Sequence, residues 1–293
     1  MFPVSFNRDS MLFAGYWVPP NPSPTLTVLN YSCGRQSHRL ARGLLRGELP
    51  MPEKLLVVSA DPGNEHRDTI RIRDRTHAEF LERGIHAVIA PGPKMLEDLK
   101  ERKASGRTRI DNSALWTASG GQSAQKCTKY YKISPMDRVV RAYLLYHMGI
   151  KQPKENSVER WIGFSWDEQS RCKPLSQKYQ QVRWPLIEMG ETKEDVELWY
   201  KMTGEEMPPP SVCNHCWANG TQTFKRISET DPEGFERAIE FDEASRDMSQ
   251  FGMREKCFVS KTLMPLVELR ANGFEATSSD SQALSCDSGM CFI

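Results

Sequence analysis

Short apolar runs alternate with amphipathic stretches over the first third of the chain. Residues 25–31, 55–59 and 86–90 are rich in aliphatic and β-branched side chains. Apolar runs of this length suit strands that are covered on both faces, so they predict three strands of a parallel sheet. Residues 39–46 place leucines at helical spacing, and residues 67–82 form a charged amphipathic segment. Strands that alternate with helices in this way predict an α/β fold with right-handed crossovers.

The same alternation continues further along the chain. Residues 135–148 favour a helix, and residues 161–164 favour another short strand. Thr192 followed by Asp195 is close to the capping-box pattern that begins a helix. We therefore expect a doubly wound, mostly parallel sheet with helices on both faces.

Changes in composition divide the chain into three parts. Residues 1–24 end in a proline-rich stretch, where missing amide donors and a fixed φ exclude a helix or a central strand. We expect an extended lead-in there, followed by the α/β domain over residues 25–225. Residues 226–293 are expected to form a helical segment and a serine-rich, cysteine-bearing tail that pack on this domain.

The overall charge favours no class of partner. The 39 basic and 38 acidic residues leave a net charge of +1, which gives no general attraction to nucleic acid, membranes or acidic proteins. No apolar run approaches the length of a bilayer span, and the N-terminus lacks a basic segment followed by an apolar one. We expect a soluble, cytoplasmic protein without a membrane partner.

The cysteines indicate metal or redox chemistry. Eight cysteines are too few for a disulfide-rich secreted scaffold of this length. Two pairs are closely spaced, Cys213 with Cys216 and Cys286 with Cys291, and such spacing suits thiolate ligands. Cys172 is better explained as a small buried hydrophobic residue.

The turn after the first predicted strand has the composition of an anion site. Small and hydroxyl-bearing residues let the backbone approach a phosphate and donate to it, and an arginine adds charge. The segment lacks the Walker pattern, and taken alone a turn of this kind is weak support for a ligand site. The residues in question are Ser32, Cys33, Gly34, Arg35, Gln36 and Ser37.

Carboxylates follow the second predicted strand. Asp61, Gly63 and Glu65 come directly after it. Oxygen ligands at the carboxyl end of a strand suit Mg²⁺ or a ribose, so Asp61 and Glu65 are candidates for these contacts. The alternative is that these residues cap a turn and start the next helix.

Five segments in this order resemble the superfamily of PP-loop ATP pyrophosphatases and phosphoadenosine-phosphosulfate (PAPS) reductases, and the members found in phages and mobile elements are the most similar. The resemblance covers roughly residues 25–266. Ser32, Gly34 and Ser37 match the Ser-Gly-Gly-x-x-Ser loop, whereas Cys33 replaces its second residue. The other matching segments are residues 61–66, Cys127 to Pro135 with Lys132, Gly163 to Arg171, and Cys213 with Cys216.

The resemblance implies a fold of the adenine nucleotide alpha-hydrolase type that binds ATP or a PAPS-like nucleotide together with Mg²⁺. Lys132 would neutralise a phosphate or sulfate, and Arg171 would clamp an anion with its two-pronged guanidinium. The cysteines would hold a [4Fe-4S] cluster. Its ligands would be Cys127, Cys213, Cys216 and one of Cys257, Cys286 and Cys291. A structural zinc ion held by Cys213, Cys216, Cys286 and Cys291 remains the alternative.

Three functions follow from the resemblance. The first is an ATP pyrophosphatase that adenylates an acceptor for sulfur transfer or for modification of a nucleobase or nucleic acid. The second is a sulfonucleotide reductase in which Cys286 or Cys291 attacks sulfur, but this tail does not match the Glu-Cys-Gly-x-His ending typical of reductases. The third is a catalytically silent nucleotide-binding protein, which Cys33 suggests. A sulfur or electron donor protein and a second copy of the chain are the expected protein partners.

Overall fold

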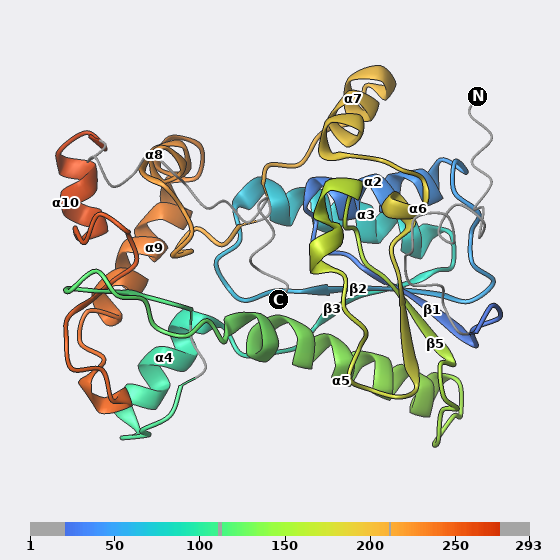
Figure 1. Ribbon diagram of the computed structural model, residues 1–293, viewed down its shortest axis with the longest axis horizontal. Coiled ribbons are helices and arrows are strands. Elements are labelled where there is room, and N and C mark those ends of the chain that lie inside the picture. Colours follow the sequence, from blue (N-terminus) through green and yellow to red (C-terminus); the bar gives the residue numbers. More distant parts are fainter. Residues whose placement is uncertain (1–20, 111–112, 211, 276–293) are drawn as a thin grey trace. The chain divides into compact units, whose positions relative to one another are not determined.

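The computed structural model describes residues 21–110, 113–210 and 212–275 (Figure 1). They divide into two compact units, each built from separate stretches of chain. Unit 1 contains the described residues of Met1–Ser59, Arg71–Ala90 and Met136–Pro209. Unit 2 contains those of Ala60–Ile70, Pro91–Pro135 and Pro210–Ile293. This division differs from the expected boundary at residue 225, because residues 91–135 pack with the C-terminal helices in a common core.

A five-stranded parallel sheet forms the centre of unit 1, so the α/β class is confirmed. The strand order is β3-β2-β1-β5-β6. Thr27 of β1 is in register with Leu55 of β2 on one side and with Glu159 of β5 on the other. The strands are β1 (Leu26–Asn30), β2 (Leu55–Ala60), β3 (His86–Ala90), β5 (Val158–Trp161) and β6 (Gln180–Arg183).

Helices cover the sheet on both faces, with α2 and α3 on one side and α5 on the other (Figure 1). A π-helical turn, Tyr143–His147, extends α5, and a 3-10 helix, Trp166–Arg171, follows β5. The helices are α2 (Arg35–Leu45), α3 (Arg67–Glu82), α5 (Ser134–Ala142), α6 (Pro185–Glu188) and α7 (Lys193–Thr203).

Local sequence patterns located several of these elements. The predictions for α3 and β3 are confirmed to the residue, and Thr192 and Asp195 form the expected capping box of α7. The helix predicted over residues 39–46 begins earlier, at Arg35. Its first turn is polar, so the spacing of apolar residues did not reveal it. The strand predicted over 161–164 is wrong in position, because β5 ends at Trp161 and leaves Gly163 in the following loop.

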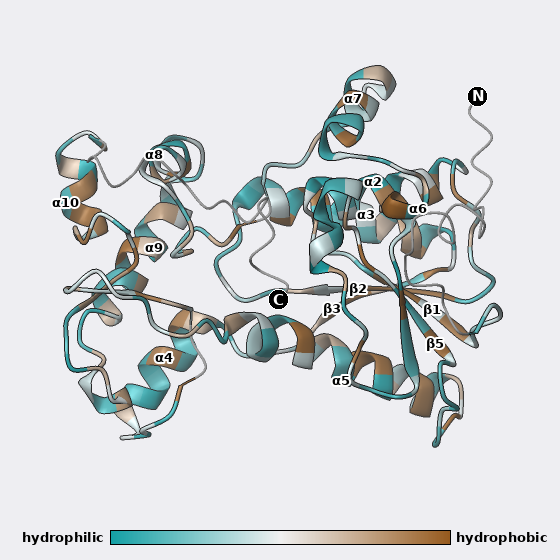
Figure 2. Ribbon diagram, in the orientation of Figure 1, coloured by the Kyte–Doolittle hydropathy of each residue, from teal (hydrophilic) through white to brown (hydrophobic). Residues whose placement is uncertain are grey.

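Apolar side chains of β1, β2 and α2 form the core of unit 1. Leu29, Val57, Leu40 and Leu44 are almost fully buried and belong to one cluster. Figure 2 shows hydrophobic and hydrophilic bands alternating along α5, as expected for a helix with one face on a sheet.

Unit 2 is mainly helical and has its own core. Its helices are α4 (Met95–Ala104), α8 (Thr221–Thr230), α9 (Pro232–Ala244) and α10 (Leu266–Ala271), with a 3-10 turn, Ser249–Phe251. A π-helix covers Thr128–Ile133. Unit 2 also contains the short strand β4 (Trp116–Thr117), which pairs antiparallel with β7 (Cys257–Phe258). The side chain of Asp231 accepts a hydrogen bond from Gly234 N and so begins α9.

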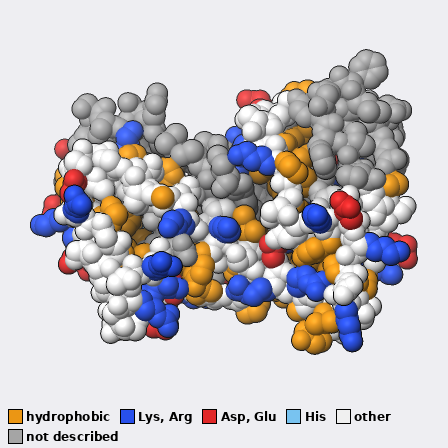
Figure 3. Space-filling view, turned by 60° about the horizontal axis from the view of Figure 1, so that its bottom comes forward, with side chains coloured by type: hydrophobic (Ala, Val, Ile, Leu, Met, Phe, Trp, Pro, Cys, Tyr) orange, Lys and Arg blue, Asp and Glu red, His pale blue; other side chains and the backbone are white. Residues whose placement is uncertain are grey.

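The described surface is mixed in character. On the face drawn in Figure 3, Lys and Arg side chains are dispersed among hydrophobic and uncharged ones. Within residues 21–110, 113–210 and 212–275, no helix is both long and apolar enough to cross a bilayer.

Candidate functional site

The loop after β1 lies where the strand order of the sheet reverses. β1 has β2 on one side and β5 on the other, and the chain reaches β5 only after completing β3. In doubly wound sheets, ligands bind beyond the carboxyl ends of the strands at such a point. β1 ends at Asn30 and α2 begins at Arg35. The predicted phosphate loop, residues 32–37, therefore occupies the position expected for a ligand site.

Cys33 adopts the backbone conformation that glycine would favour. Its φ is 57°, which lies in the left-handed region that residues with a side chain seldom occupy. The side chain is 1% exposed, and Tyr31 Oη donates to its Sγ at 3.3 Å. The thiol therefore packs into the core beneath the loop.

The loop hydroxyls are bonded within the loop itself. The Oγ atoms of Ser32 and Ser37 are 3.0 Å apart, and Ser37 Oγ donates to Gly34 O at 3.1 Å. The N-cap of α2 is Gly34, which has no side chain to cap the helix, and the first turn carries no acidic residue. The amides and partial positive charge of a helix N-terminus favour an anion, so this helix start suits a phosphate.

Gly163 lets the segment after β5 pack directly on this helix start. A Cβ atom at Gly163 would lie 2.7 Å from Ser37 N and 2.9 Å from Ser37 Cα. Both are backbone atoms, which cannot turn away as a flexible side chain could. Only glycine therefore fits here.

Glu168 links the loop to Arg171. Gln36 Nε2 donates to Glu168 Oε2 at 3.2 Å, and Arg171 Nη1 donates to Glu168 Oε1 at 2.6 Å. The guanidinium carbon of Arg171 lies 4.1 Å from the centre of the Phe164 ring, and burial lowers the pKa of Arg171. The predicted anion clamp is thus connected to the loop through one buried carboxylate.

Arg35 has a different partner from the one expected. Its Nη1 lies 2.5 Å from Glu197 Oε1, and its carbonyl oxygen accepts a hydrogen bond from Tyr200 Oη at 2.8 Å. Both partners are on α7. In this structure Arg35 therefore fastens the start of α2 to α7.

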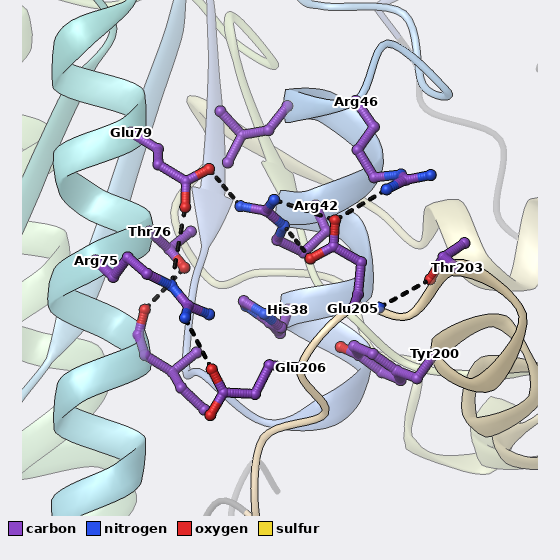
Figure 4. A network of polar contacts seen from close by, with 12 residues as sticks. His38, Arg42, Arg46, Arg75, Thr76, Glu79, Tyr200, Thr203, Glu205 and Glu206 are labelled. Atoms are coloured by element: carbon purple, nitrogen blue, oxygen red, sulfur yellow. Dashed lines mark hydrogen bonds and ion pairs between the residues drawn. The ribbon is translucent and has the colours of Figure 1, made fainter.

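A network of ion pairs holds the other end of α2 (Figure 4). Arg42 and Arg46 both contact Glu205, at 2.9 and 3.0 Å, and Arg42 also pairs with Glu79 of α3. Arg75 of α3 binds Glu206 at 2.8 Å. Glu205 and Glu206 follow α7, so α2, α3 and this segment are tied together. The network fixes the helix that carries the loop.

Three cysteines line one small cavity in unit 2. The cavity measures about 10 Å³, which is roughly the space of one water molecule. Cys127, Cys213 and Cys216, three of the predicted metal ligands, all reach it. The other lining residues are Pro62, Met95, Ser113, Thr128, Tyr131, Lys132 and His215. Several of these lie on the π-helix, a form that often occurs at functional sites.

A buried ion pair lies beside the thiols. Lys132 Nζ and Cys213 Sγ each lie 3.5 Å from Glu65 Oε1. Burial alone would lower the pKa of Lys132, but Cys213 when ionised, and Glu65, raise it above its ordinary value. Burial raises the pKa of Cys216 to about 12 and also raises that of Cys213. Both thiols therefore need a metal or a further positive charge to ionise.

The donor atoms in the cavity are of the type that zinc and iron–sulfur clusters accept. Three thiols share the cavity, and two buried atoms, His215 Nε2 and Glu65 Oε2, have no hydrogen-bond partner among the described residues. A buried polar atom of this kind calls for a water, an ion or a ligand. In the part of the chain that the structure describes, no three His, Cys, Asp or Glu side chains converge closely enough for a single ion. An iron–sulfur cluster binds its thiolates at different irons, so it does not need that convergence.

The remaining predicted ligands are elsewhere or outside the description. Cys257 is buried on β7, where its Sγ lies 3.6 Å from Glu255 O, and it does not line the cavity. Cys286 and Cys291 lie outside the described residues.

The residues after β2 form a capped turn. Asp61 Oδ1 accepts from Gly63 N at 2.9 Å, and Asp61 Oδ2 pairs with Lys94 at 2.8 Å. Gly63 has a φ of 102°, which a side chain would strain. Asp61, Gly63 and Glu65 belong to unit 2, whereas the phosphate loop belongs to unit 1. Lys132, predicted to neutralise a phosphate, also belongs to unit 2, where it neutralises Glu65.

Sequence reasoning assigned no role to Gly163, Glu168 or His215. Gly163 and Glu168 stand in the segment Gly163 to Arg171, of which only the arginine was predicted to contact a ligand. His215 stands between two cysteines in the sequence and lines the cavity with them.

No family model matches this chain, and no curated protein does.

Proposed function

We propose that this chain is a PP-loop type adenine-nucleotide enzyme, an ATP pyrophosphatase that adenylates an acceptor in the cytoplasm. The observation that carries the proposal is the uncapped N-terminus of α2 at the point of strand-order reversal, closed on one side by Gly163. The five matching segments of the sequence support the adenine nucleotide in particular.

The proposed reaction needs positioning and charge neutralisation more than covalent catalysis. An oxygen of the acceptor attacks the α-phosphorus of ATP, and pyrophosphate leaves. A sulfur or nitrogen nucleophile then displaces AMP from the acceptor. The amides of the first turn of α2 would stabilise the charge that develops on the phosphates, and Mg²⁺ would neutralise the leaving pyrophosphate.

Arg171 is the side chain that we assign to the anion in unit 1. Its guanidinium is held by Glu168 and by the Phe164 ring, so little conformational entropy is lost when it binds. Glu168 also holds Gln36, so the arginine and the loop are oriented by the same group. Such pre-organisation lowers the cost of charge stabilisation in the transition state.

In unit 2, Cys127, Cys213 and Cys216 would hold the metal centre. A [4Fe-4S] cluster there would supply electrons or a site for sulfur, depending on the acceptor. Lys132, which pairs with Glu65, lines the same cavity. No disulfide joins the six cysteines that the structure describes, which agrees with a reducing compartment.

The test is ATP binding and pyrophosphate release by the purified full chain with Mg²⁺. Ser37→Ala removes a loop hydroxyl, and Arg171→Gln removes the clamp. We expect each variant to bind ATP about tenfold more weakly, a loss of about 1.4 kcal/mol. The control is Ser228→Ala, because the Ser228 hydroxyl also donates to a main-chain carbonyl, that of Lys225 at 2.7 Å, but on α8.

Two results would refute the proposal. One is an ATP affinity that neither Ser37→Ala nor Arg171→Gln changes. The other is a crystal structure with ATP bound away from residues 32–37. Binding without pyrophosphate release, in the presence of candidate nucleobase acceptors, would instead favour the catalytically silent alternative.

A further inference from the structure

A cavity of about 480 Å³ lies at the amino ends of β5 and β6. Its walls come from α5, from the segment that precedes β5 and from the two residues before β6. The strands β1, β5 and β6 are parallel, so this edge of the sheet is opposite to the edge at which residues 32–37 follow β1. The volume is that of a small-molecule site. The charged and aromatic side chains that line it are those of Arg141, Lys151, Glu155, Lys178 and Tyr179.

Basic side chains outnumber acidic ones around this cavity. Lys151 and Lys178 are exposed, and neither forms an ion pair within residues 21–110, 113–210 and 212–275. With Glu155 as the one acidic residue, the lining has a net charge of +2. Positive charges gathered around one hollow without acidic partners attract an anion.

Arg141 has one guanidinium nitrogen in use and one without a partner. Its Nη2 donates to Lys151 O at 3.2 Å, and its guanidinium carbon lies 5.7 Å from the centre of the Tyr179 ring. Its Nη1 is buried and has no hydrogen-bond partner in the part of the chain that the structure describes. A buried donor of this kind calls for a water or a ligand that accepts from it.

Tyr179 supplies a further donor on a preformed wall. Its Oη accepts from Gln180 Nε2 at 2.8 Å, and among the described residues its own hydroxyl hydrogen has no acceptor. Burial raises the pKa of Tyr179, so the phenol keeps this hydrogen at neutral pH. Main-chain hydrogen bonds of 3.0 Å, from Asn156 N to Lys178 O and from Val158 N to Tyr179 O, join the segments before β5 and β6. The donors are therefore held in place before a ligand binds.

We propose that this cavity binds the phosphate group of a small phosphate monoester. Such a group carries a charge of about −1.5 to −2 at neutral pH, which matches the charge of the lining. A phosphate diester carries only one negative charge, so it matches less well. Arg141 would donate to the phosphate oxygens, as guanidinium groups commonly do, and Lys151 and Lys178 would act as point charges. Glu155 could accept from a hydroxyl or amino group of the esterified part.

The test titrates the full chain, with ¹³C-labelled tyrosine, with inorganic phosphate, glycerol 3-phosphate and dimethyl phosphate. The ring signal of Tyr179, assigned by its loss in Tyr179→Phe, should shift on addition of the first two. Dimethyl phosphate, a diester with one charge, should bind at least about fivefold more weakly. Crystals soaked in tungstate, a phosphate analogue that anomalous scattering locates, should carry this anion beside Arg141.

Variants then assign the binding to the lining residues. Arg141→Gln should weaken the binding of glycerol 3-phosphate by about tenfold, because it removes a hydrogen bond between charged groups. Replacing Lys151 and Lys178 together by glutamine should weaken it by a similar factor, and both side chains are exposed, so folding should be unaffected. The matched control is Lys201→Gln, because Lys201 is an exposed lysine of the same unit that does not line the cavity.

A Tyr179 signal that neither inorganic phosphate nor glycerol 3-phosphate shifts would overturn the inference. So would tungstate bound only elsewhere, dimethyl phosphate bound as tightly as the monoester, or an equal loss of affinity in Lys201→Gln. The inference concerns unit 1 and does not rest on the proposed nucleotide chemistry. Ser37→Ala keeps the two apart, because it should weaken ATP binding and leave the titration of Tyr179 by glycerol 3-phosphate unchanged.

Discussion

Replacing Gly163 by alanine tests whether the segment after β5 closes the phosphate loop. The added Cβ would meet Ser37 N at 2.7 Å, Ser37 Cα at 2.9 Å and the carbonyl carbon of Gln36 at 3.0 Å. Ordinary contacts begin at 3.4 Å, so the helix start or the segment has to move by roughly 0.7 Å. Overpacking of this kind costs about 1–3 kcal/mol.

Two measurements follow from that movement. Thermal unfolding should begin at a lower temperature, by about 2–4 °C for each kcal/mol lost. ATP affinity should fall by about tenfold, and pyrophosphate release by up to about a hundredfold, because a displacement near 1 Å disturbs the alignment of reacting groups. Activity should therefore fall further than affinity.

The matched control is Gly121→Ala. A Cβ there would meet only side-chain oxygens, the nearest being Thr117 Oγ1 at 3.1 Å, which can rotate away. We expect this variant to unfold and to bind ATP like the wild-type protein. If Gly163→Ala also behaved like the wild type in both assays, the close approach of the two segments would be refuted. A loss of stability without a loss of ATP affinity would refute only the proposal that this close approach matters for nucleotide binding.

Three further predictions concern the parts around the two sites. The hydrogen bond from Arg71 lowers the pKa of Glu206 to about 2, below its unfolded value of about 4.3, so its contribution to stability is complete above about pH 5 and is lost as the pH falls towards 2. Glu206→Gln should remove this part of the acid dependence, seen as melting temperature against pH. Lys132→Met leaves the buried carboxylate of Glu65 without its partner and should lower the free energy of unfolding by about 3–5 kcal/mol. Thr192→Ala removes the cap of α7 and should cost about 1 kcal/mol in urea unfolding.

Each of these predictions has a result that contradicts it. An unchanged acid profile in Glu206→Gln would show that the pairs of Glu206 with Arg71 and Arg75 are not formed in solution. For Lys132→Met, adding Glu65→Gln should restore part of the lost stability, and no restoration would mean that the two side chains act independently. A Thr192→Ala protein as stable as the wild type would show that the hydrogen bond to Asp195 N contributes nothing.

Local patterns predicted the elements whose sequence alone favours one conformation. The spacing of apolar residues located α3 and β3, and Thr192 with Asp195 marked the start of α7. β6 was not predicted, because its sequence Gln-Gln-Val-Arg has no apolar run. It is a strand because β5 pairs with it and because Gln181 exchanges hydrogen bonds with Asn21.

The candidate sites were predicted in part. Composition and order predicted a phosphate loop at residues 32–37, and the sheet places these residues after β1 at the point where the strand order reverses. Cys127 was grouped with Cys213 and Cys216 by resemblance, and all three reach one cavity. Cys127 lies far from Cys213 and Cys216 in the sequence, and the distance between such residues in space depends on the fold. The sequence therefore could not show that His215 lines the same cavity or that Cys257 does not.

The sequence by itself determined the alternation of strands and helices, the position of the polar turn after the first strand, and the thiol spacing of Cys213 and Cys216. These are properties of neighbouring residues, which short-range backbone and side-chain preferences control. Only the tertiary structure decided that Gly163 lies against Ser37, that Lys132 pairs with Glu65, and which residues join the thiols. Such contacts depend on how distant segments pack, and packing is set by the shape and burial of the whole core.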